Sequence, residues 1–146
     1  MSHVSELLSR KPSAIHAVRP EDSVRTAIET MIAHNIGAVI VLEDGQVSGI
    51  FTERDVLKRV ALTGRSPEST RVQDVMTERL VVLGPDHTVE ECMATMTQAR
   101  VRHLPIVDRM RIVGIISIGD VVRHLSAERE VELRYMTDYI AGRYPA

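Results

Sequence analysis

The chain has 146 residues and a formal net charge of −2 with histidine neutral, and 44% of its residues are hydrophobic and 26% charged. This composition is typical of a soluble globular protein, and the length is sufficient to fold without a metal or a disulfide. The balanced charge disfavours a general nucleic-acid-binding role, and no apolar run reaches the about 18–20 residues that cross a bilayer. The single cysteine, Cys92, cannot form an internal disulfide, and the first residues lack the features of a signal peptide, so we expect a cytoplasmic protein with no membrane partner.

The sequence repeats itself once, with a shift of 65 residues. Residues 20–57 align with residues 85–122 without a gap, and eight of the thirty-eight pairs are identical, against roughly two or three expected from composition. The chain therefore contains two copies of one structural unit.

The first copy predicts a strand, a helix, a hairpin and a short helix. Ser23 is a good N-cap, and the apolar residues after it recur at the spacing of one buried helix face. Asp44-Gly45 between two apolar runs is a hairpin signal. In chain order we expect a strand at 15–18, a helix from Ser23, strands at 38–42 and 47–51, and a helix near 54–62.

The second copy predicts the same order of elements. Thr88 and Glu91 have the spacing of a capping box. The turn Asp108-Arg109-Met110-Arg111 has no glycine, so we expect its geometry to differ from that of the first hairpin. The expected elements are a strand at 80–83, a helix from Thr88, strands at 104–107 and 112–116, and a helix near 119–125.

The predicted fold class is α/β (α+β): two β-α-β-β-α repeats packed sheet to sheet about a pseudo-twofold axis, plus a C-terminal helix. The pattern of this last helix runs to Gly142, and it packs either on its own domain or on a second copy. Two equivalent clefts are expected between the repeats, where ligand sites are common. We divide the chain into 1–62, a polar linker at 63–71, 72–126 and 127–146.

Sequence patterns that carry catalysis are missing. The six histidines have no metal-ligand spacing, and neither a phosphate-binding P-loop nor a nucleophile elbow is present. Cys92 lies on the apolar face of a predicted helix, which favours a core position over a nucleophile. We therefore expect no enzyme activity and no metal site.

The chemistry-bearing signal is a motif at the junction between the last strand and the last helix of each copy. It reads Gly-x-x-(Thr/Ser)-x-x-Asp, with Thr52 and Asp55 in the first copy and Ser117 and Asp120 in the second. The spacing places the hydroxyl and the carboxylate on one side of the first helical turn. A hydroxyl and free N–H groups favour a phosphate, and a carboxylate can accept from both ribose hydroxyls, so together they suit a nucleotide.

A structural interpretation of the same motif stays open. Thr52 and Ser117 can be N-caps, and Asp55 and Asp120 can be acids that favour the positive end of the helix dipole. The register of the two copies favours the ligand interpretation.

The chain resembles a tandem pair of CBS domains, or Bateman module, over roughly residues 4 to 126. The resemblance rests on the repeat, on these junction motifs, on the Asp74-Val75-Met76-Thr77 stretch and on residues 102–108. It looks most like the stand-alone bacterial CBS-pair proteins. The resemblance implies adenine nucleotides (AMP, ADP or ATP) or related adenosyl ligands such as NAD(H) in the two clefts, and a homodimer that gathers phosphates near its middle.

The resemblance also implies which residues touch the ligand. Asp55 and Asp120 match positions that hold ribose, and Thr52 and Ser117 match positions that touch phosphate. The positions beside the base and the phosphates are Ile36, Gly37, Ala38, Val101, Arg102 and His103. The backbone positions that read the adenine edge correspond to His16 and Val82. The candidate ligand-binding set is completed by Arg54, Gly119 and Lys11.

The two copies differ where phosphate charge is expected. Gly37-Ala38 stands in the first copy where Arg102-His103 stands in the second, and Arg54 precedes Asp55 where Gly119 precedes Asp120. Lys11 is by its type ordinarily a surface charge. We expect the two clefts to differ in affinity.

Two functions are weighed. The first is a non-catalytic regulatory module that binds adenosyl ligands and signals by a change of shape or of affinity for a regulated protein that the sequence does not identify. The second is a structural or adaptor homodimer with vestigial clefts, which captures partners through the C-terminal helix.

Overall fold

The computed structural model describes residues 2–11, 15–128 and 140 of the chain. Its elements in order are α1 (Val4–Ser9), β1 (Ala17–Val18), α2 (Val24–His34), β2 (Ala38–Glu43), β3 (Gln46–Thr52), α3 (Glu53–Asp55), the π-helical segment η1 (Val56–Ala61), the 3-10 turn η2 (Val72–Asp74), α4 (Val89–Ala99), β4 (His103–Asp108), β5 (Arg111–Ser117) and α5 (Ile118–Glu128). The order confirms two similar units. Most of the predicted C-terminal helix at 127–146 lies outside the described residues.

The two long helices begin and end as their sequences predict. Ser23 accepts a hydrogen bond from the Thr26 backbone, and Thr88 and Glu91 form the capping box. Both helices end in a left-handed residue, Asn35 in the first repeat and Arg100 in the second. Their buried residues follow one face, Val24, Ala27 and Met31 in α2 and Val89, Cys92 and Met96 in α4.

The sheets of the two repeats differ by one strand. In the first repeat β1 pairs in parallel with β2, and β2 pairs antiparallel with β3; the second repeat has only the pair β4–β5. The expected strand at 80–83 is reduced to one bridge between Leu83 and Ile106. In the first repeat the Ile40 N–H donates to the His16 carbonyl. Pro105 takes the place of Ile40 in the second repeat and has no N–H to donate, so the ladder shortens.

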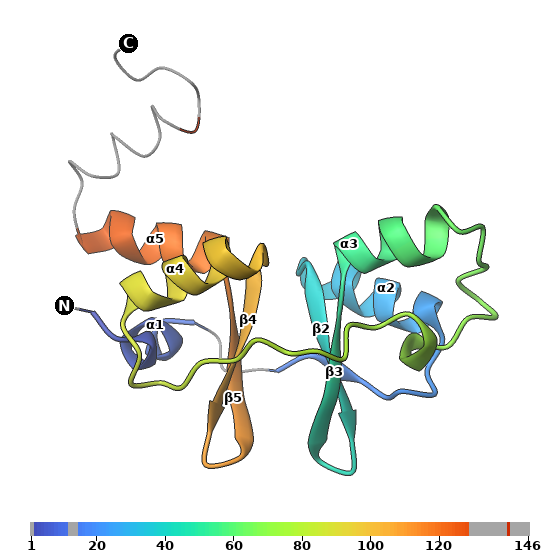
Figure 1. Cartoon of the computed structure of the whole chain (residues 1–146), viewed down its shortest axis with the longest axis horizontal. Coiled ribbons are helices and arrows are strands. Elements are labelled where there is room, and N and C mark those ends of the chain that lie inside the picture. The colour runs from blue at the N-terminus through green and yellow to red at the C-terminus, as the bar shows by residue number, and fades with distance from the viewer. Residues whose placement is uncertain (1, 12–14, 129–139, 141–146) are drawn as a thin grey trace.

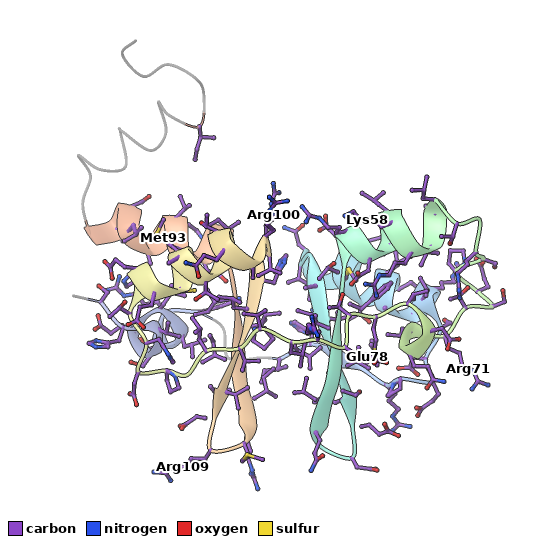
Figure 2. The ribbon with its side chains drawn as sticks, viewed as in Figure 1. Lys58, Arg71, Glu78, Met93, Arg100 and Arg109 are labelled. Atoms are coloured by element: carbon purple, nitrogen blue, oxygen red, sulfur yellow. The ribbon has the colours of Figure 1, made fainter. Side chains whose placement is uncertain are left out.

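Both hairpin turns have the same backbone geometry, so the predicted difference between them is wrong. Asp44 and Gly45 have φ values of 52° and 79°, and Arg109 and Met110 have values of 52° and 68°. A two-residue turn with both residues at positive φ matches the twist of the strands that it joins. The strand pairing therefore imposes this turn on Arg109, at the hairpin tip (Figure 2), and on Met110, although neither is glycine.

The segment that precedes each repeat packs into the core of the other repeat. Val4 and Leu7 of α1 are buried with the core of the second repeat, between residues of α4 and β4. Val72, Val75 and Met76, which lead into the second repeat, belong to the core of the first. Figure 1 shows α1 beside α4 and β4, and the connection after η1 crossing in front of both sheets. The sequence analysis did not predict this exchange.

A third apolar cluster joins the two sheets and confirms their predicted face-to-face packing. Its buried residues are Ala38, Ile40 and Ile50 of the first repeat, and Ile112 and Ile115 of β5 pack against them. Within the described part of the chain, no helix is both long enough and apolar enough to cross a membrane.

Candidate ligand-binding site

Each hydroxyl–carboxylate pair closes the start of its own helix. Thr52 Oγ1 accepts from the Asp55 N–H at 3.2 Å, and Asp55 Oδ2 accepts from the Thr52 N–H at 3.0 Å. In the second repeat Ser117 Oγ accepts from the Asp120 N–H at 3.1 Å, and Asp120 Oδ2 accepts from the Ser117 N–H at 2.9 Å. The capping interpretation therefore describes the geometry of both pairs. Both carboxylates are buried, with exposed fractions of 6% and 8%.

Asp55 is held from outside its helix mainly by a backbone-anchored threonine. Thr77 Oγ1 lies 3.2 Å from Asp55 Oδ1 and 3.3 Å from Oδ2. Thr77 is itself fixed by two backbone hydrogen bonds to Ile50. The Arg59 guanidinium lies farther away, with Nε 3.7 Å from Asp55 Oδ1.

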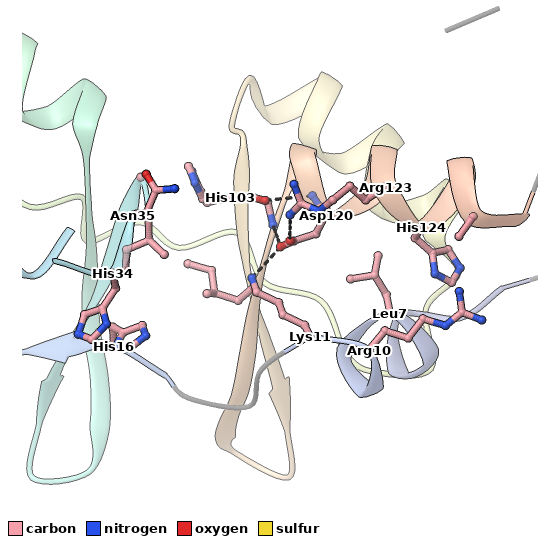
Figure 3. A pocket seen from close by; sticks show the side chains of 16 residues that line it. Leu7, Arg10, Lys11, His16, His34, Asn35, His103, Asp120, Arg123 and His124 are labelled. Atoms are coloured by element: carbon pink, nitrogen blue, oxygen red, sulfur yellow. Dashed lines mark hydrogen bonds and ion pairs between the residues drawn. The ribbon is translucent and has the colours of Figure 1, made fainter. Parts of the chain in front are cut away.

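Asp120 is held instead by two basic side chains (Figure 3). Lys11 Nζ donates to Asp120 Oδ2 and to the Ile115 carbonyl, both at 2.6 Å, and Arg123 Nη2 donates to Asp120 Oδ1 at 2.6 Å. Burial raises the pKa of the Asp120 carboxyl, but the hydrogen bonds from Lys11 and from the Ser117 backbone outweigh it, so this pKa lies below its ordinary value. Asp120 is therefore ionised at neutral pH.

A cavity of about 590 Å³ opens between the repeats around Asp120. Eight of the predicted ligand residues line it: Lys11, His16, Ile36, Gly37, Ala38, His103, Ser117 and Asp120. The junction of the second repeat thus faces the start of β2 in the first, and α1 contributes the end of its helix. This volume is within the range of small-molecule sites.

The other seven predicted residues do not line this cavity: Thr52, Arg54, Asp55, Val82, Val101, Arg102 and Gly119. Arg54 instead reaches the C-terminal end of α4, where its Nη1 lies 3.4 Å from the Arg100 carbonyl. Arg102 is exposed, and its carbonyl accepts from the Ile118 N–H at the start of α5. The cavity thus gathers eight of the fifteen predicted residues, and Gly119 lies beside it, next to Ser117 and Arg123.

The charge of the cavity lining is positive. Among the described residues, Arg10, Lys11 and Arg123 line it together with one carboxylate, Asp120, which gives a formal charge of +2 with histidine neutral. Of the two cations that contact Asp120, Lys11 is the less exposed: 29% of its side chain is accessible, against 74% for Arg123. A concave site with excess positive charge favours an anionic ligand.

Histidines form the opposite wall. The rings of His16 and His34 stack with centroids 3.7 Å apart and an interplanar angle of 20°. Burial, the neighbouring His34 and the charge of Lys11 lower the pKa of His16. Burial also lowers the pKa of His103, and the Glu53 carboxylate only partly offsets it. His16 and His103 are therefore mostly neutral at pH 7, available as hydrogen-bonding and stacking surfaces.

Gly37 lies at a close approach between the repeats. A Cβ atom on Gly37 would lie 2.8 Å from Glu53 Oε1 and 3.2 Å from the His103 ring. The side chains of Glu53 and His103 thus occupy the space that a larger residue would need.

Five polar residues of the cavity lining were not predicted from the sequence: Arg10, His34, Asn35, Arg123 and His124. Arg123 follows Asp120 by three residues, a spacing at which side chains meet on a helix, and this signal could have found it. Arg10 and His34 carry no repeated pattern, because the motif search relied on residues shared by both copies. Thr77, which holds Asp55, was noted only as part of the Asp74–Thr77 stretch.

The arrangement is suited to binding. In the described residues, no group of three or more His, Cys, Asp or Glu side chains is placed to hold a metal ion. Cys92 is fully buried, and burial followed by the charge of Asp120 raises the pKa of its thiol to about 11, so it is not a reactive thiolate. What the cavity offers is a buried acceptor for hydroxyl groups beside a cluster of cations.

Comparison with known proteins identifies the repeat. The family model described as "CBS domain" matches twice, at residues 4–62 and 72–127. The chain is 40% identical over 129 residues to the mitochondrial CBS domain-containing protein CBSX3 of Arabidopsis thaliana, covering 85% of the chain and 63% of that longer protein. It is 35% identical over 129 residues to the CBS domain-containing protein YhcV of Bacillus subtilis, covering 88% of the chain and 89% of YhcV.

Solved structures agree. A CBS-domain containing protein from Agrobacterium tumefaciens superimposes with a TM-score of 0.80 at 43% identity, covering 84% of this chain and 98% of that one. The CBS domain pair of protein MJ0100, solved in complex with 5′-methylthioadenosine and S-adenosyl-L-methionine, gives a TM-score of 0.76 at 25% identity, covering 88% and 99%. The chain therefore belongs to the CBS-domain family, and its two repeats form a CBS-domain pair.

Proposed function

We propose that the chain is a non-catalytic regulatory module that binds a phosphorylated adenosyl ligand in the cavity around Asp120. The observation that carries this proposal is the combination, in one cavity between the repeats, of a buried ionised carboxylate with three basic side chains. The carboxylate is an acceptor for the two hydroxyls of a ribose, and the cations are partners for phosphate.

The geometry suggests how such a ligand lies. The ribose sits at Asp120 and Ser117, at the start of α5, with its phosphates toward Arg10, Lys11 and Arg123. The base then rests on the apolar side chains at the start of β2, Ile36 and Ala38, near the His16–His34 stack. The predicted residues around Asp55 would form the second and weaker site of the pair.

Charge favours a nucleotide over the ligands of the MJ0100 pair. S-Adenosylmethionine carries a sulfonium cation and methylthioadenosine has no phosphate, whereas a phosphomonoester carries close to two negative charges. The formal +2 of the cavity lining is matched by AMP. AMP, ADP, ATP and NAD(H) are therefore the proposed ligands.

The ligand would regulate by shifting the relative arrangement of the repeats or the affinity for a protein partner. Such a shift is limited by the difference in ligand affinity between the two states, ordinarily about 1–3 kcal/mol.

We also propose a homodimer in the cytoplasm. Three apolar side chains of the first repeat are exposed, Ile32, Leu57 and Leu62, at 75%, 66% and 83%, and a second copy would cover them; sedimentation at micromolar concentration tests this.

Isothermal titration calorimetry of the purified chain tests the binding proposal. AMP, ADP, ATP and NAD⁺ should bind, with S-adenosylmethionine and methylthioadenosine at least about tenfold weaker. If none of the six ligands gives heat at about 100 μM protein, the proposal is wrong, and a structural or adaptor dimer becomes the better account.

A further inference from the structure

The ammonium of Lys11 occupies the place where a ribose hydroxyl would bind. Its Nζ lies 2.6 Å from Asp120 Oδ2, and it also donates to the Ile115 carbonyl at 2.6 Å. In the first repeat the equivalent carbonyl, that of Ile50, is bonded by the backbone N–H of Thr77. The second repeat thus contacts this carbonyl with a charged side chain from a residue 104 positions away in the sequence, whereas the first repeat contacts it with backbone.

The Asp120 carboxylate has few acceptor positions left. Oδ2 accepts from the Ser117 N–H and from Lys11, and Oδ1 accepts from Arg123. Two carboxylate oxygens offer about four acceptor positions in all. A ribose that donates both hydroxyls therefore has to displace at least one of the two basic side chains.

Lys11 is the cation that cannot simply turn to solvent. The Arg123 side chain is 74% exposed and is hydrated without Asp120, whereas that of Lys11 is 29% exposed. Within the part of the chain that the structure describes, Asp120 is the sole carboxylate that lines the cavity. A displaced Lys11 leaves a partly buried ammonium in the cavity, and a new anion there stabilises that charge.

We propose that Lys11 is a specificity-determining residue that holds Asp120 until a ligand phosphate takes its ammonium over. The inference rests on the proposed function and deepens it. A phosphorylated ligand exchanges one ion pair for another, since its ribose takes Asp120 while its phosphate takes Lys11. A neutral nucleoside offers nothing for Lys11 and binds weakly. The ammonium therefore selects for phosphate twice, by opposing nucleosides and by attracting nucleotides.

The first experiment tests the Lys11–Asp120 pair without any ligand. The chain has two lysines, Lys11 and the exposed Lys58 on η1 (Figure 2). Brief acylation with an N-hydroxysuccinimide ester, followed by peptide mass spectrometry, should label Lys11 at least about tenfold more slowly than Lys58. Asp120→Asn keeps an acceptor for the Ser117 N–H and removes the charge, so it should accelerate labelling of Lys11 and leave Lys58 unchanged. Equal rates for the two lysines, or no response to Asp120→Asn, would overturn the proposal.

The second experiment tests the exchange. Lys11→Met keeps an unbranched stem and removes the ammonium, and Lys58→Met is its matched control outside the cavity. By calorimetry, Lys11→Met should bind adenosine more tightly and AMP more weakly than the unmodified chain, narrowing the AMP-to-adenosine affinity ratio at least about tenfold. Lys58→Met should keep the original ratio. An unchanged ratio in Lys11→Met overturns the exchange.

The two experiments separate the inference from the proposed function. If neither adenosine nor any of the six ligands of the calorimetric test binds, the proposed function fails and the exchange fails with it, whereas slow labelling of Lys11 still establishes its pairing with Asp120. If AMP binds tightly but Lys11 is labelled as fast as Lys58, the proposed function stands and Lys11 is not the selecting residue.

Discussion

The two carboxylates at equivalent positions of the repeats differ in what holds them. Asp55 is contacted by a threonine hydroxyl whose backbone is locked to β3, and Asp120 by the ends of two basic side chains. Each carboxylate closes its helix with the same capping hydrogen bonds. The local motif was thus duplicated faithfully, while contacts from distant segments of the chain gave the two sides different chemistry.

This difference teaches where function is to be sought in a duplicated fold. The positions that the repeats share build the frame of the clefts, the strands and the helix starts. Two of the residues that make one cleft cationic, Arg10 and Lys11, precede the aligned part of the first repeat, whereas Arg123 has Lys58 as its counterpart. Four pairs of substitutions or conditions sharpen or break this comparison.

The largest expected effect is on ligand binding by Asp120→Asn. An amide can no longer accept from two ribose hydroxyls, and loss of a hydrogen bond to a charged group weakens AMP binding roughly 10- to 100-fold. The matched substitution Asp55→Asn should weaken it less than about threefold in the tighter site. Calorimetry of both variants measures the two losses of AMP affinity. A larger loss in Asp55→Asn than in Asp120→Asn would show that the tighter site is the one around Asp55, which contradicts the account.

Two glycines at equivalent positions of β3 and β5 should differ in their tolerance of alanine. A Cβ on Gly49 would lie 2.8 Å from the Thr77 carbonyl, part of the backbone, and 2.7 Å from Met76 Sδ. A Cβ on Gly114 would meet only the end of the Leu8 side chain, at 2.6 Å. Gly49→Ala should therefore lower the free energy of unfolding by about 3 kcal/mol and Gly114→Ala by about 1 kcal/mol. Urea denaturation measures both, and the opposite order would contradict the structure.

The hairpin turns supply a smaller effect with opposite signs. Met110 holds the positive φ that Gly45 holds in the first repeat, and its side chain is 96% exposed, so it gains nothing from packing. Met110→Gly should raise the free energy of unfolding by about 1 kcal/mol, and Gly45→Ala should lower it by about 1 kcal/mol. Thermal denaturation of the two variants tests this; destabilisation by Met110→Gly would mean that the turn is not of this type.

The smallest effect concerns pH. The pKa of His103 lies below its ordinary value of 6.5 because of burial, so below that pH the unfolded chain binds more protons than the folded one. The contribution is present above pH 6.5 and is lost as the pH falls through the lowered pKa. The first repeat has Ala38 at this position and no such group. His103→Ala should reduce the loss of stability between pH 7 and 5 by under about 1 kcal/mol; identical pH profiles would show that burial does not perturb His103.

Much of the fold could be predicted from the sequence because its signals are local. The caps at Ser23 and Thr88, the apolar helix faces and the Asp44-Gly45 hairpin depend on residues within one turn or one hairpin of each other. The strand at 80–83 failed because its partner carries Pro105, whose missing N–H acts across the sheet. The prediction of a different turn geometry at Arg109 and Met110 was wrong because the twist of the strands overrides residue preference.

The candidate site divides along the same line. Ser117, Asp120 and the Ile36–Ala38 segment were found because they recur in register or match a family pattern. The contact between Lys11 and Asp120 spans 109 residues, and it depends on α1 packing into the core of the second repeat. No local pattern encodes that packing, so the contact between Lys11 and Asp120 could be identified only in three dimensions.

A crystal structure of the chain with AMP tests the central claim most directly. The account predicts AMP in the cavity between the repeats, its ribose hydroxyls on the Asp120 carboxylate and its phosphate within hydrogen-bond distance of Lys11, with Lys11 no longer bonded to Asp120. AMP bound only at Asp55, or bound in the cavity with the Lys11–Asp120 pair intact, would contradict it.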